Sequence, residues 1–236
     1  MNNMNNQLDH IVIGAATLEQ GVAWCEATLG VVAGPGGEHL HMGTHNRLLR
    51  ICSDAFPAAY LEIIAIAPHL AAPTAQPRWF DLDNAAVQHS LQTRGPQLLH
   101  WVAQTTDIAA ACAATEALGV NLGQPQSVSR MTPRGLLQWS FSVSPTGQRP
   151  MQGALPHLIE WANASPVTHM PQSELKLASV TIGGTPDVVN TLEQCAAALQ
   201  LPGIQIARAG ATNTPALRVQ LNTPKGVVWL DAIDLS

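Results

Sequence analysis

The sequence predicts an α+β protein built from repeated β-α-β-β-β modules. Short apolar runs with the two-residue alternation of strands are separated by stretches with helical spacing, and the same order of elements recurs along the chain. Four of the strands also carry one histidine or glutamate inside an apolar run, in the order His, Glu, His, Glu. These observations predict both the fold class and a shared site.

The first module is predicted over residues 8–66. An alternating strand at residues 8–14 leads into a helix of roughly a dozen residues, which should end at Gly30 because glycine is a favoured helix C-cap. After a glycine-rich stretch, extended segments follow at residues 48–52 and 60–66. The order of elements is therefore β-α-β-β-β.

The second module is predicted over residues 97–163. A strand at residues 98–103 precedes a helix at residues 107–118, where Asp107 suits the helix start and Gly119 the helix end. Three more extended segments complete the module, at residues 126–131, 136–144 and 157–162.

A third module is predicted over residues 176–236. It begins with a strand at residues 177–182, and Pro186 then suits the start of a helix that continues through residue 199. Ser179 stands where the other modules carry a histidine, so this copy lacks the metal-binding side chains. Its remaining strands are predicted at residues 204–207, 216–221 and 226–233.

Three stretches are predicted to lie outside these modules. Residues 1–7 are expected to be a disordered tail. Residues 67–96 contain four of the seventeen prolines, which favours a long surface connection with a short helix near residues 82–91. Residues 164–175 contain two further prolines and are expected to be a linker.

Composition narrows the class of protein. Apolar residues make up 46% of the 236 residues and charged residues only 11%, so the chain should be mostly packed. The net charge of −5 argues against a nucleic-acid or anionic-membrane partner, because such partners require clustered Lys and Arg. No apolar run is long enough to span a membrane, and the first residues lack a signal-peptide pattern, which predicts a cytoplasmic location. The four cysteines are widely separated, which indicates neither a zinc knuckle nor a disulfide framework.

The four strand residues His10, Glu62, His100 and Glu160 are the candidate metal ligands. Burying one such side chain alone costs several kcal/mol unless it is paired, neutralised or coordinated. If all four side chains point inward, two imidazoles and two carboxylates suit a divalent ion such as zinc, nickel, manganese, cobalt or ferrous iron.

Paired modules with a histidine on each first strand and a glutamate on each last strand resemble the vicinal oxygen chelate superfamily, which includes glyoxalase I and the extradiol dioxygenases. The closest resemblance is to glyoxalase-like domain proteins. It rests on Leu8-Asp9-His10, Pro35-Gly36-Gly37-Glu38-His39, Met42-Gly43-Thr44-His45-Asn46 and Tyr60-Leu61-Glu62. The resemblance implies a curved mixed sheet that encloses a cleft, with a metal held by the four ligand candidates.

The same resemblance implies a divalent-metal-dependent isomerase or lyase that acts on a small oxygenated metabolite through a metal-stabilised enolate. Glu160 is the first choice for the base and Glu62 the second. A ferrous extradiol-type dioxygenase would use only His10, His100 and Glu160, and a fourth ligand at Glu62 argues against it. A metal-free binding protein of the bleomycin-resistance kind is the other alternative.

Residues near the expected rim of the cleft are candidates for contacting the substrate. His39 and Asn46 are predicted to form hydrogen bonds with it, and His45 is an auxiliary acid or base. In the second module, Trp139 and Arg130 or Arg134 occupy equivalent segments, and an arginine there would bind a carboxylate or phosphate. The unpaired sheet of the third module predicts a homodimer.

Overall fold

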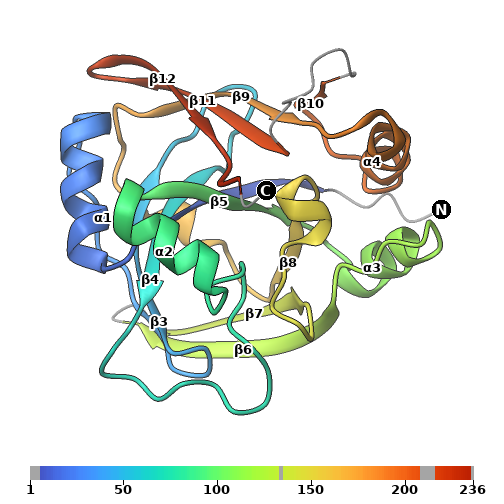
Figure 1. The fold of residues 1–236 in the computed structure, drawn as a ribbon, viewed down its shortest axis with the longest axis horizontal. Coiled ribbons are helices and arrows are strands. Elements are labelled where there is room, and N and C mark those ends of the chain that lie inside the picture. Colours follow the sequence, from blue (N-terminus) through green and yellow to red (C-terminus); the bar gives the residue numbers. More distant parts are fainter. Residues whose placement is uncertain (1–5, 133–134, 208–215, 235–236) are drawn as a thin grey trace.

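The computed structural model describes residues 6–132, 135–207 and 216–234. It contains an eight-stranded mixed sheet with strand order β2-β3-β4-β1-β5-β8-β7-β6 and a four-stranded sheet with order β10-β9-β11-β12. The larger sheet curves strongly and is nearly closed, and the smaller sheet lies across its outer side (Figure 1). The α+β class and the curved sheet predicted from the sequence are confirmed.

The first module has the predicted order of elements. Its strands are β1 (Gln7–Gly14), β2 (Glu38–His39), β3 (Thr44–Arg50) and β4 (Tyr60–Ile66), and its helix is α1 (Leu18–Trp24), extended by a π-helical turn at Cys25–Leu29. Thr17 caps the start of α1 by accepting a hydrogen bond from the Gln20 amide. The π-helical turn ends at Gly30, whose φ of 75° is the left-handed conformation that glycine adopts without strain.

The second module repeats the first. Its elements are β5 (Gln97–Gln104), α3 (Ile108–Glu116), β6 (Gln124–Thr132), β7 (Gly135–Val143) and β8 (His157–Trp161). Asp107 caps α3 by accepting from the Ala110 amide at 2.9 Å. In each module the last strand pairs parallel with the first, and the antiparallel pair β1–β5 joins the modules at the centre of the sheet.

The C-terminal unit comprises β9 (Lys176–Ile182), α4 (Pro186–Ala198), β10 (Ile204–Ile206), β11 (Leu217–Thr223) and β12 (Gly226–Asp231). The order of elements is the predicted β-α-β-β-β. The pairing differs from that of the other modules, because β9 pairs parallel with the second strand of the unit, β10, and antiparallel with β11. The unit therefore shares the element order of the other two without repeating their sheet.

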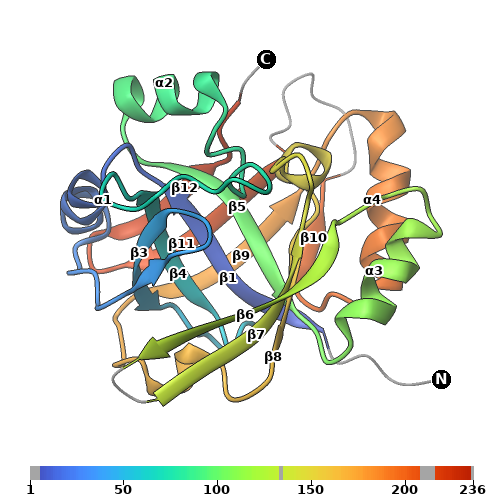
Figure 2. The same ribbon diagram turned by 90° about the horizontal axis from the view of Figure 1, so that it is seen from below.

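Two apolar cores lie on the two faces of the eight-stranded sheet. On the convex face, side chains such as Ile11 and Trp101 pack against the smaller sheet, including Val180. On the concave face, Val12 and Phe141 pack with apolar side chains from the connection between the modules. Figure 2 shows the C-terminal unit on one side of this sheet and the β6–β7 hairpin closing the other.

The connection at residues 67–96 enters the interior. It contains α2 (Ala85–Arg94), close to the predicted short helix, and its Trp79 and Phe80 side chains are buried on the concave face. Phe80 and Asp81 both have positive φ, near 60°, a conformation that costs a non-glycine residue about 1–3 kcal/mol. This turn places the Asp81 carboxylate against Arg149, 2.6 Å from its Nε atom.

Replacing Arg149 with methionine is expected to lower the free energy of unfolding by about 3 kcal/mol, because the half-buried Asp81 carboxylate loses its buried partner. The substitution also removes the 2.9 Å hydrogen bond from the Arg149 guanidinium to the Leu99 carbonyl. Urea unfolding followed by circular dichroism measures the loss. Arg218 makes a comparable but exposed ion pair with Asp231, and the matched Arg218→Met variant should lose at most about 1 kcal/mol. Equal losses in the two variants would contradict the prediction.

The last two residues of the predicted tail, Asn6 and Gln7, have defined positions in the structure. β1 already begins at Gln7, and the Asn6 side chain donates a hydrogen bond to the Leu199 carbonyl at 2.5 Å. Residues 1–5 lie outside the described residues.

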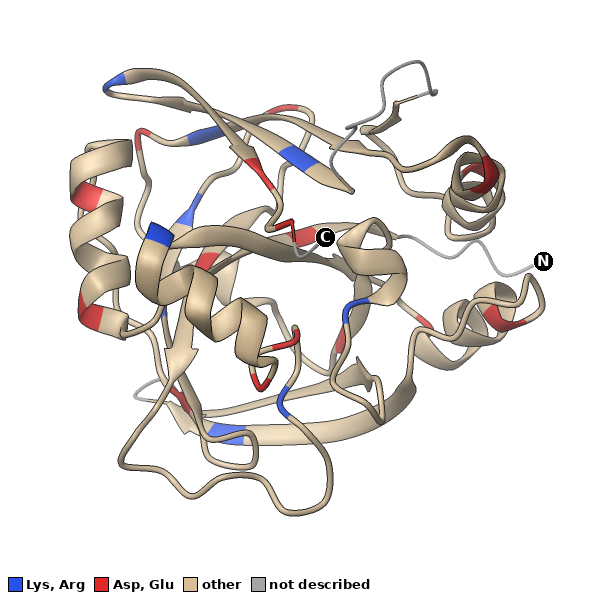
Figure 3. Cartoon of the chain, viewed as in Figure 1, with Lys and Arg blue, Asp and Glu red and all other residues tan. Residues whose placement is uncertain are grey.

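Charged residues of both signs are sparse along the chain (Figure 3). Within the described ranges, no helix is long and apolar enough to cross a membrane. Val227 and Trp229 are exposed on β12, at the edge of the smaller sheet. The homodimer and the cytoplasmic location stay predictions, and sedimentation velocity would test the first of them.

Candidate functional site

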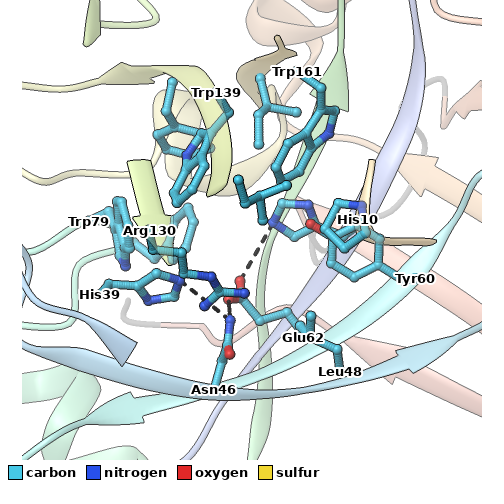
Figure 4. Close-up of a pocket in the computed structure, with 15 residues that line it drawn as sticks. His10, His39, Asn46, Leu48, Tyr60, Glu62, Trp79, Arg130, Trp139 and Trp161 are labelled. Atoms are coloured by element: carbon cyan, nitrogen blue, oxygen red, sulfur yellow. Dashed lines mark hydrogen bonds and ion pairs between the residues drawn. The ribbon is translucent and has the colours of Figure 1, made fainter. Parts of the chain in front are cut away.

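A small cavity of about 50 Å³ lies on the concave face of the eight-stranded sheet. Strands of both modules and the inserted connection contribute to its wall (Figure 4). Its lining combines ionisable or polar groups with aromatic rings. The lining residues are His10, His39, Asn46, Leu48, Tyr60, Glu62, Trp79, Phe80, Arg130, Leu137, Trp139, Phe141, Ile159, Trp161 and Pro166.

His10 lies between two carboxylates at the wall of this cavity. Its Nδ1 atom is 2.7 Å from Asp9 Oδ1, and its Nε2 atom is 3.5 Å from Glu62 Oε2. Because an ionised carboxylate only accepts hydrogen bonds, the contact with Asp9 places a hydrogen on Nδ1. Nε2 is then the atom that faces Glu62 and the cavity.

A bulge in β1 explains how neighbouring residues come to interact in this way. Leu8 pairs with Ala103 and His10 with Val102, so that Asp9 is the extra residue of the β1–β5 ladder. A β-bulge re-aims the side chains around it. The Asp9 carboxylate is fully buried, and its Oδ2 atom accepts a 2.8 Å hydrogen bond from the Trp161 indole.

Glu62 is held from its other side by a chain of polar groups on β2 and β3. Asn46 Nδ2 donates to Glu62 Oε1 at 2.6 Å and lies 3.4 Å from His39 Nε2. His39 Nδ1 is 3.0 Å from the Thr44 hydroxyl. Burial, and then the charge of Arg130, hold the pKa of His39 well below its usual value, so this ring is neutral at neutral pH.

Aromatic rings enclose the acid and base groups. Tyr60 stacks on His10 with ring centroids 4.7 Å apart, and Trp139 packs against Trp161 at 5.6 Å. Burial, followed by the charges of Asp9 and Glu62, raises the pKa of Tyr60 well above its usual value. The phenol therefore keeps its proton, and the rings make a low-dielectric wall around the ionisable groups.

Arg130 reaches into the cavity from β6, beside His39 and above Asn46 (Figure 4). Its Nη1 atom is buried and has no hydrogen-bond partner among the described residues. Gly37 permits this position, since a Cβ atom there would lie 2.2 Å from Nη1. A buried guanidinium nitrogen without a partner is a natural contact for an anion.

His100 does not join His10 and Glu62. It lies under Phe80, with ring centroids 5.3 Å apart, and its Nε2 atom accepts a hydrogen bond from the His157 amide at 3.1 Å. The His157 ring nitrogen Nδ1 lies 2.8 Å from the same atom. Burial holds the pKa of His100 well below its usual value and lowers that of His157 to about 3.

The strand register makes this histidine pair the counterpart of His10 and Glu62. Val12, two residues after His10, pairs with Glu62, and Val102, two residues after His100, pairs with His157. The bulge is repeated too, with Leu99 as the extra residue where β1 has Asp9. The two modules thus share their geometry but carry different chemistry.

Glu160 points away from the cavity. Its Oε2 atom accepts a 2.8 Å hydrogen bond from the Ile108 amide at the first turn of α3. Side chains alternate along a strand, and the neighbours Ile159 and Trp161 are the ones that line the cavity. The predicted convergence of all four ligand candidates does not occur in this structure.

Some of the other predicted site residues line the cavity and some do not. His39, Asn46, Arg130 and Trp139 line the cavity. His45 lies on the opposite face of β3 from Asn46, with its ring 5.9 Å from that of His69. Arg134 lies outside the described residues.

A divalent ion does not fit the donor set in this arrangement. Only His10 Nε2 and one Glu62 oxygen approach each other closely in the cavity, and the described residues contain no group of three or more His, Cys, Asp or Glu side chains that could hold a metal. Catalytic zinc sites take three protein ligands, and non-haem ferrous sites take two histidines and a carboxylate, which is more than these two groups supply.

Sequence reasoning missed several residues of the site, among them Asp9, Tyr60 and Trp161. Asp9 carried a signal, because it is the acid next to a strand histidine. Tyr60 and Trp161 were visible as strand aromatics, but only the structure shows the stacking on His10 and the hydrogen bond to Asp9.

Comparisons with known proteins agree with this architecture. A family model described as a glyoxalase-like domain matches residues 8–200. A comparison with curated protein sequences finds no match. Among solved structures, a hypothetical protein from Staphylococcus aureus is similar over 97% of this chain and 87% of its own, with 14% identity and a TM-score of 0.58. This likeness supports the fold.

Methylmalonyl-CoA epimerases are also similar, over a smaller share of the chain. The Streptomyces coelicolor epimerase matches 67% of this chain and 96% of its own length, with 20% identity and a TM-score of 0.41. For the Mycobacterium tuberculosis epimerase the shares are 66% and 88%, the identity is 20% and the TM-score is 0.40.

Proposed function

Because this chain belongs to the glyoxalase-like domain family, we propose that it is an isomerase or lyase that removes a proton from a carbon next to a carbonyl or carboxylate group. The substrate is a small oxygenated metabolite. The observation that carries the proposal is the approach of Glu62 Oε2 to His10 Nε2, 3.5 Å apart, in a cavity walled by aromatic rings. A carboxylate and an imidazole side by side can act as base and acid on one substrate.

Each group has a definite part in the proton transfer. Asn46 occupies Glu62 Oε1, which leaves Oε2 to take the proton while the C–H electron pair moves to the substrate oxygen as an enolate forms. In an isomerisation, His10, carrying a proton on Nε2, gives it to the neighbouring carbon or oxygen of the enolate. Glu62 then passes its proton to His10 across the 3.5 Å gap, which restores both groups.

Four further residues support the reaction. Asp9 holds the tautomer and orientation of His10. The unpaired Nη1 atom of Arg130 is placed to balance the negative charge of the enolate. Trp139 and Trp161 keep bulk water away, which strengthens these electrostatic interactions. No step is routed through a metal ion, because the donor set does not fit one.

Solvent hydrogen exchange tests the proposal without knowledge of the product. The protein is incubated in heavy water with a panel of 2-hydroxy, 2-keto and 2-substituted carboxylic acids, and proton NMR follows the signal of the hydrogen next to the carboxyl group. We expect this signal to disappear for at least one class of compound while its other signals persist. Binding without exchange of that hydrogen would contradict the proposal.

Elemental analysis addresses metal-stabilised enolate chemistry separately. About one divalent ion per chain in protein purified without an affinity metal, lost in a His10→Ala variant, would mean that the side chains rearrange around an ion.

A metal-free binding protein is the second candidate. The aromatic wall favours it, because ligand pockets are mostly apolar with a few placed polar groups. The buried acid–base pair favours the enzyme, since a binder has no need for a base next to an imidazole.

A further inference from the structure

A second and larger cavity adjoins the first. It has a volume of about 630 Å³ and shares His39, Arg130 and Trp139 with the small cavity. We call it the outer cleft. It is lined by residues 36–41 before β3, by residues 128–132 of β6, and by Leu136 and Trp139 of β7.

The sizes of the two cavities divide any ligand into two parts. The inner cavity, of about 50 Å³, is far smaller than a typical site for a whole ligand. It therefore accepts one small group of a ligand, such as a carboxylate. The outer cleft lies within the usual range of ligand sites, about 300–1,000 Å³, and would hold the rest of the molecule.

Charge fixes which end of the ligand points inward. Arg130 lines both cavities, and its buried Nη1 atom has no hydrogen-bond partner among the described residues. Glu38 lies on the exposed side of the outer cleft, 2.7 Å from His69. Glu62 also lies in the inner cavity, but its oxygens face Asn46 and His10. An anionic group is attracted to the unpaired Arg130 nitrogen and repelled by Glu38 at the outer end, so it enters the inner cavity first.

The outer cleft has an apolar and exposed rim. Leu40 is 70% exposed, Met131 75% and Leu136 49%, and all three line the same cleft. Single exposed apolar residues are normal, but three around one cavity mark a surface that binds apolar matter.

We propose that the ligand of this site is an amphipathic carboxylate. Its carboxylate contacts Arg130 at the inner cavity, and its alkyl or aryl portion lies in the outer cleft against Leu40, Met131 and Leu136. This inference rests on the site described under the proposed function and adds the chemical class of the ligand.

A homologous series of ligands tests the inference. Isothermal titration calorimetry is carried out with butyrate, hexanoate, octanoate and decanoate, and with 1-octanol and octylamine as uncharged and cationic controls. We expect the dissociation constant to fall by about two- to fourfold for each added methylene that becomes buried. Octanoate should bind at least about tenfold more tightly than either control, because octanol and octylamine cannot form the charge-assisted hydrogen bond between a carboxylate and Arg130.

Variants separate the contributions of the two cavities. Arg130→Met should weaken every carboxylate by about tenfold or more and leave the dependence on chain length intact. Gly37→Ala should act in the same direction without removing the charge, because its Cβ would displace Nη1. The double variant Met131→Ser/Leu136→Ser should keep the affinity for butyrate and flatten the dependence on chain length. Val227→Ser, at an exposed apolar residue on the other sheet, is the matched control and should change neither.

Several results would overturn the inference. One is equal affinity for octanoate and octanol, and another is an affinity that does not depend on chain length. A third is an unchanged dependence on chain length in the double variant. The fourth is a double variant in which only the oligomeric state changes. The last would make the apolar rim a contact between two copies of the chain. Failure of the proposed function would give a different result. The carboxylates would then bind with the expected dependence on chain length, but no hydrogen exchange would be observed.

Discussion

Replacement of Glu62 by glutamine is expected to slow proton exchange at the substrate carbon by about a hundredfold to ten-thousandfold, the usual contribution of a general base. Glutamine keeps the size of the side chain and can still accept from Asn46, which donates to Glu62 Oε1 at 2.6 Å. It lacks the second carboxylate oxygen that faces His10. The rate is measured by proton NMR in heavy water with the most reactive compound of the acid panel.

Glu160→Gln is the matched control for this substitution. Glu160 has the same side chain on the other module, but its carboxylate accepts from the Ile108 amide and lies outside the cavity lining. Glutamine can keep that hydrogen bond, so exchange should continue at the rate of the original protein. Loss of exchange in Glu160→Gln together with normal exchange in Glu62→Gln would instead support Glu160 as the base.

Acid is expected to destabilise the fold between about pH 6.5 and pH 3, partly through the buried pair His100 and His157. Burial lowers the pKa of His157 from 6.5 to about 3. In this window the unfolded chain binds a proton that the native protein refuses, so the stabilising contribution is complete above pH 6.5 and is lost as the pH falls. One such histidine lowers the free energy of unfolding by about 1.4 kcal/mol per pH unit.

Urea unfolding at pH 7, 6, 5 and 4 measures this slope. His157→Phe removes the titrating ring and retains an aromatic side chain next to Phe80 and Phe141. The slope of its unfolding free energy against pH should be smaller by about the contribution of one histidine. An unaltered slope in His157→Phe would mean that the acid effect comes from other groups.

Local patterns predicted the repeated elements well, because helix ends and strand alternation depend on neighbouring residues. Gly30 and Asp107 act as helix ends in the structure as the sequence predicts. The same local patterns singled out His10 and Glu62 as ligand candidates, and both residues line the cavity in the structure. The pairing of β9 with β10 was not predictable in the same way, since alternation does not specify which strand lies next to which.

The misplacement of Glu160 has a physical cause. β8 is apolar on both faces, because Leu158 packs in the convex core and Ile159 in the concave one. In a strand buried on both sides, alternation no longer distinguishes inside from outside. The orientation of His45 could have been predicted from the sequence. His45 is adjacent to Asn46 on one strand, and neighbouring side chains of a strand point to opposite faces of the sheet.

The position of His100 depends on distant parts of the chain. Phe80 covers it, and that ring comes from the connection that was expected to remain on the surface. Bulges at Asp9 and Leu99 are likewise set by pairing between β1 and β5. No local pattern contains this information, because these contacts join residues that are far apart in sequence.

The covering of His100 by Phe80 bears on the stereochemistry of ligand binding. The antiparallel pair β1–β5 relates the two modules by an approximate twofold axis, and a pocket with equivalent halves could hold a ligand in either of two orientations. With one half filled by Phe80, His100 and His157, a ligand meets acid and base groups from one direction only. A carbon bound next to Glu62 would therefore present one of its two faces to the base, and the fold itself would select between mirror-image substrates.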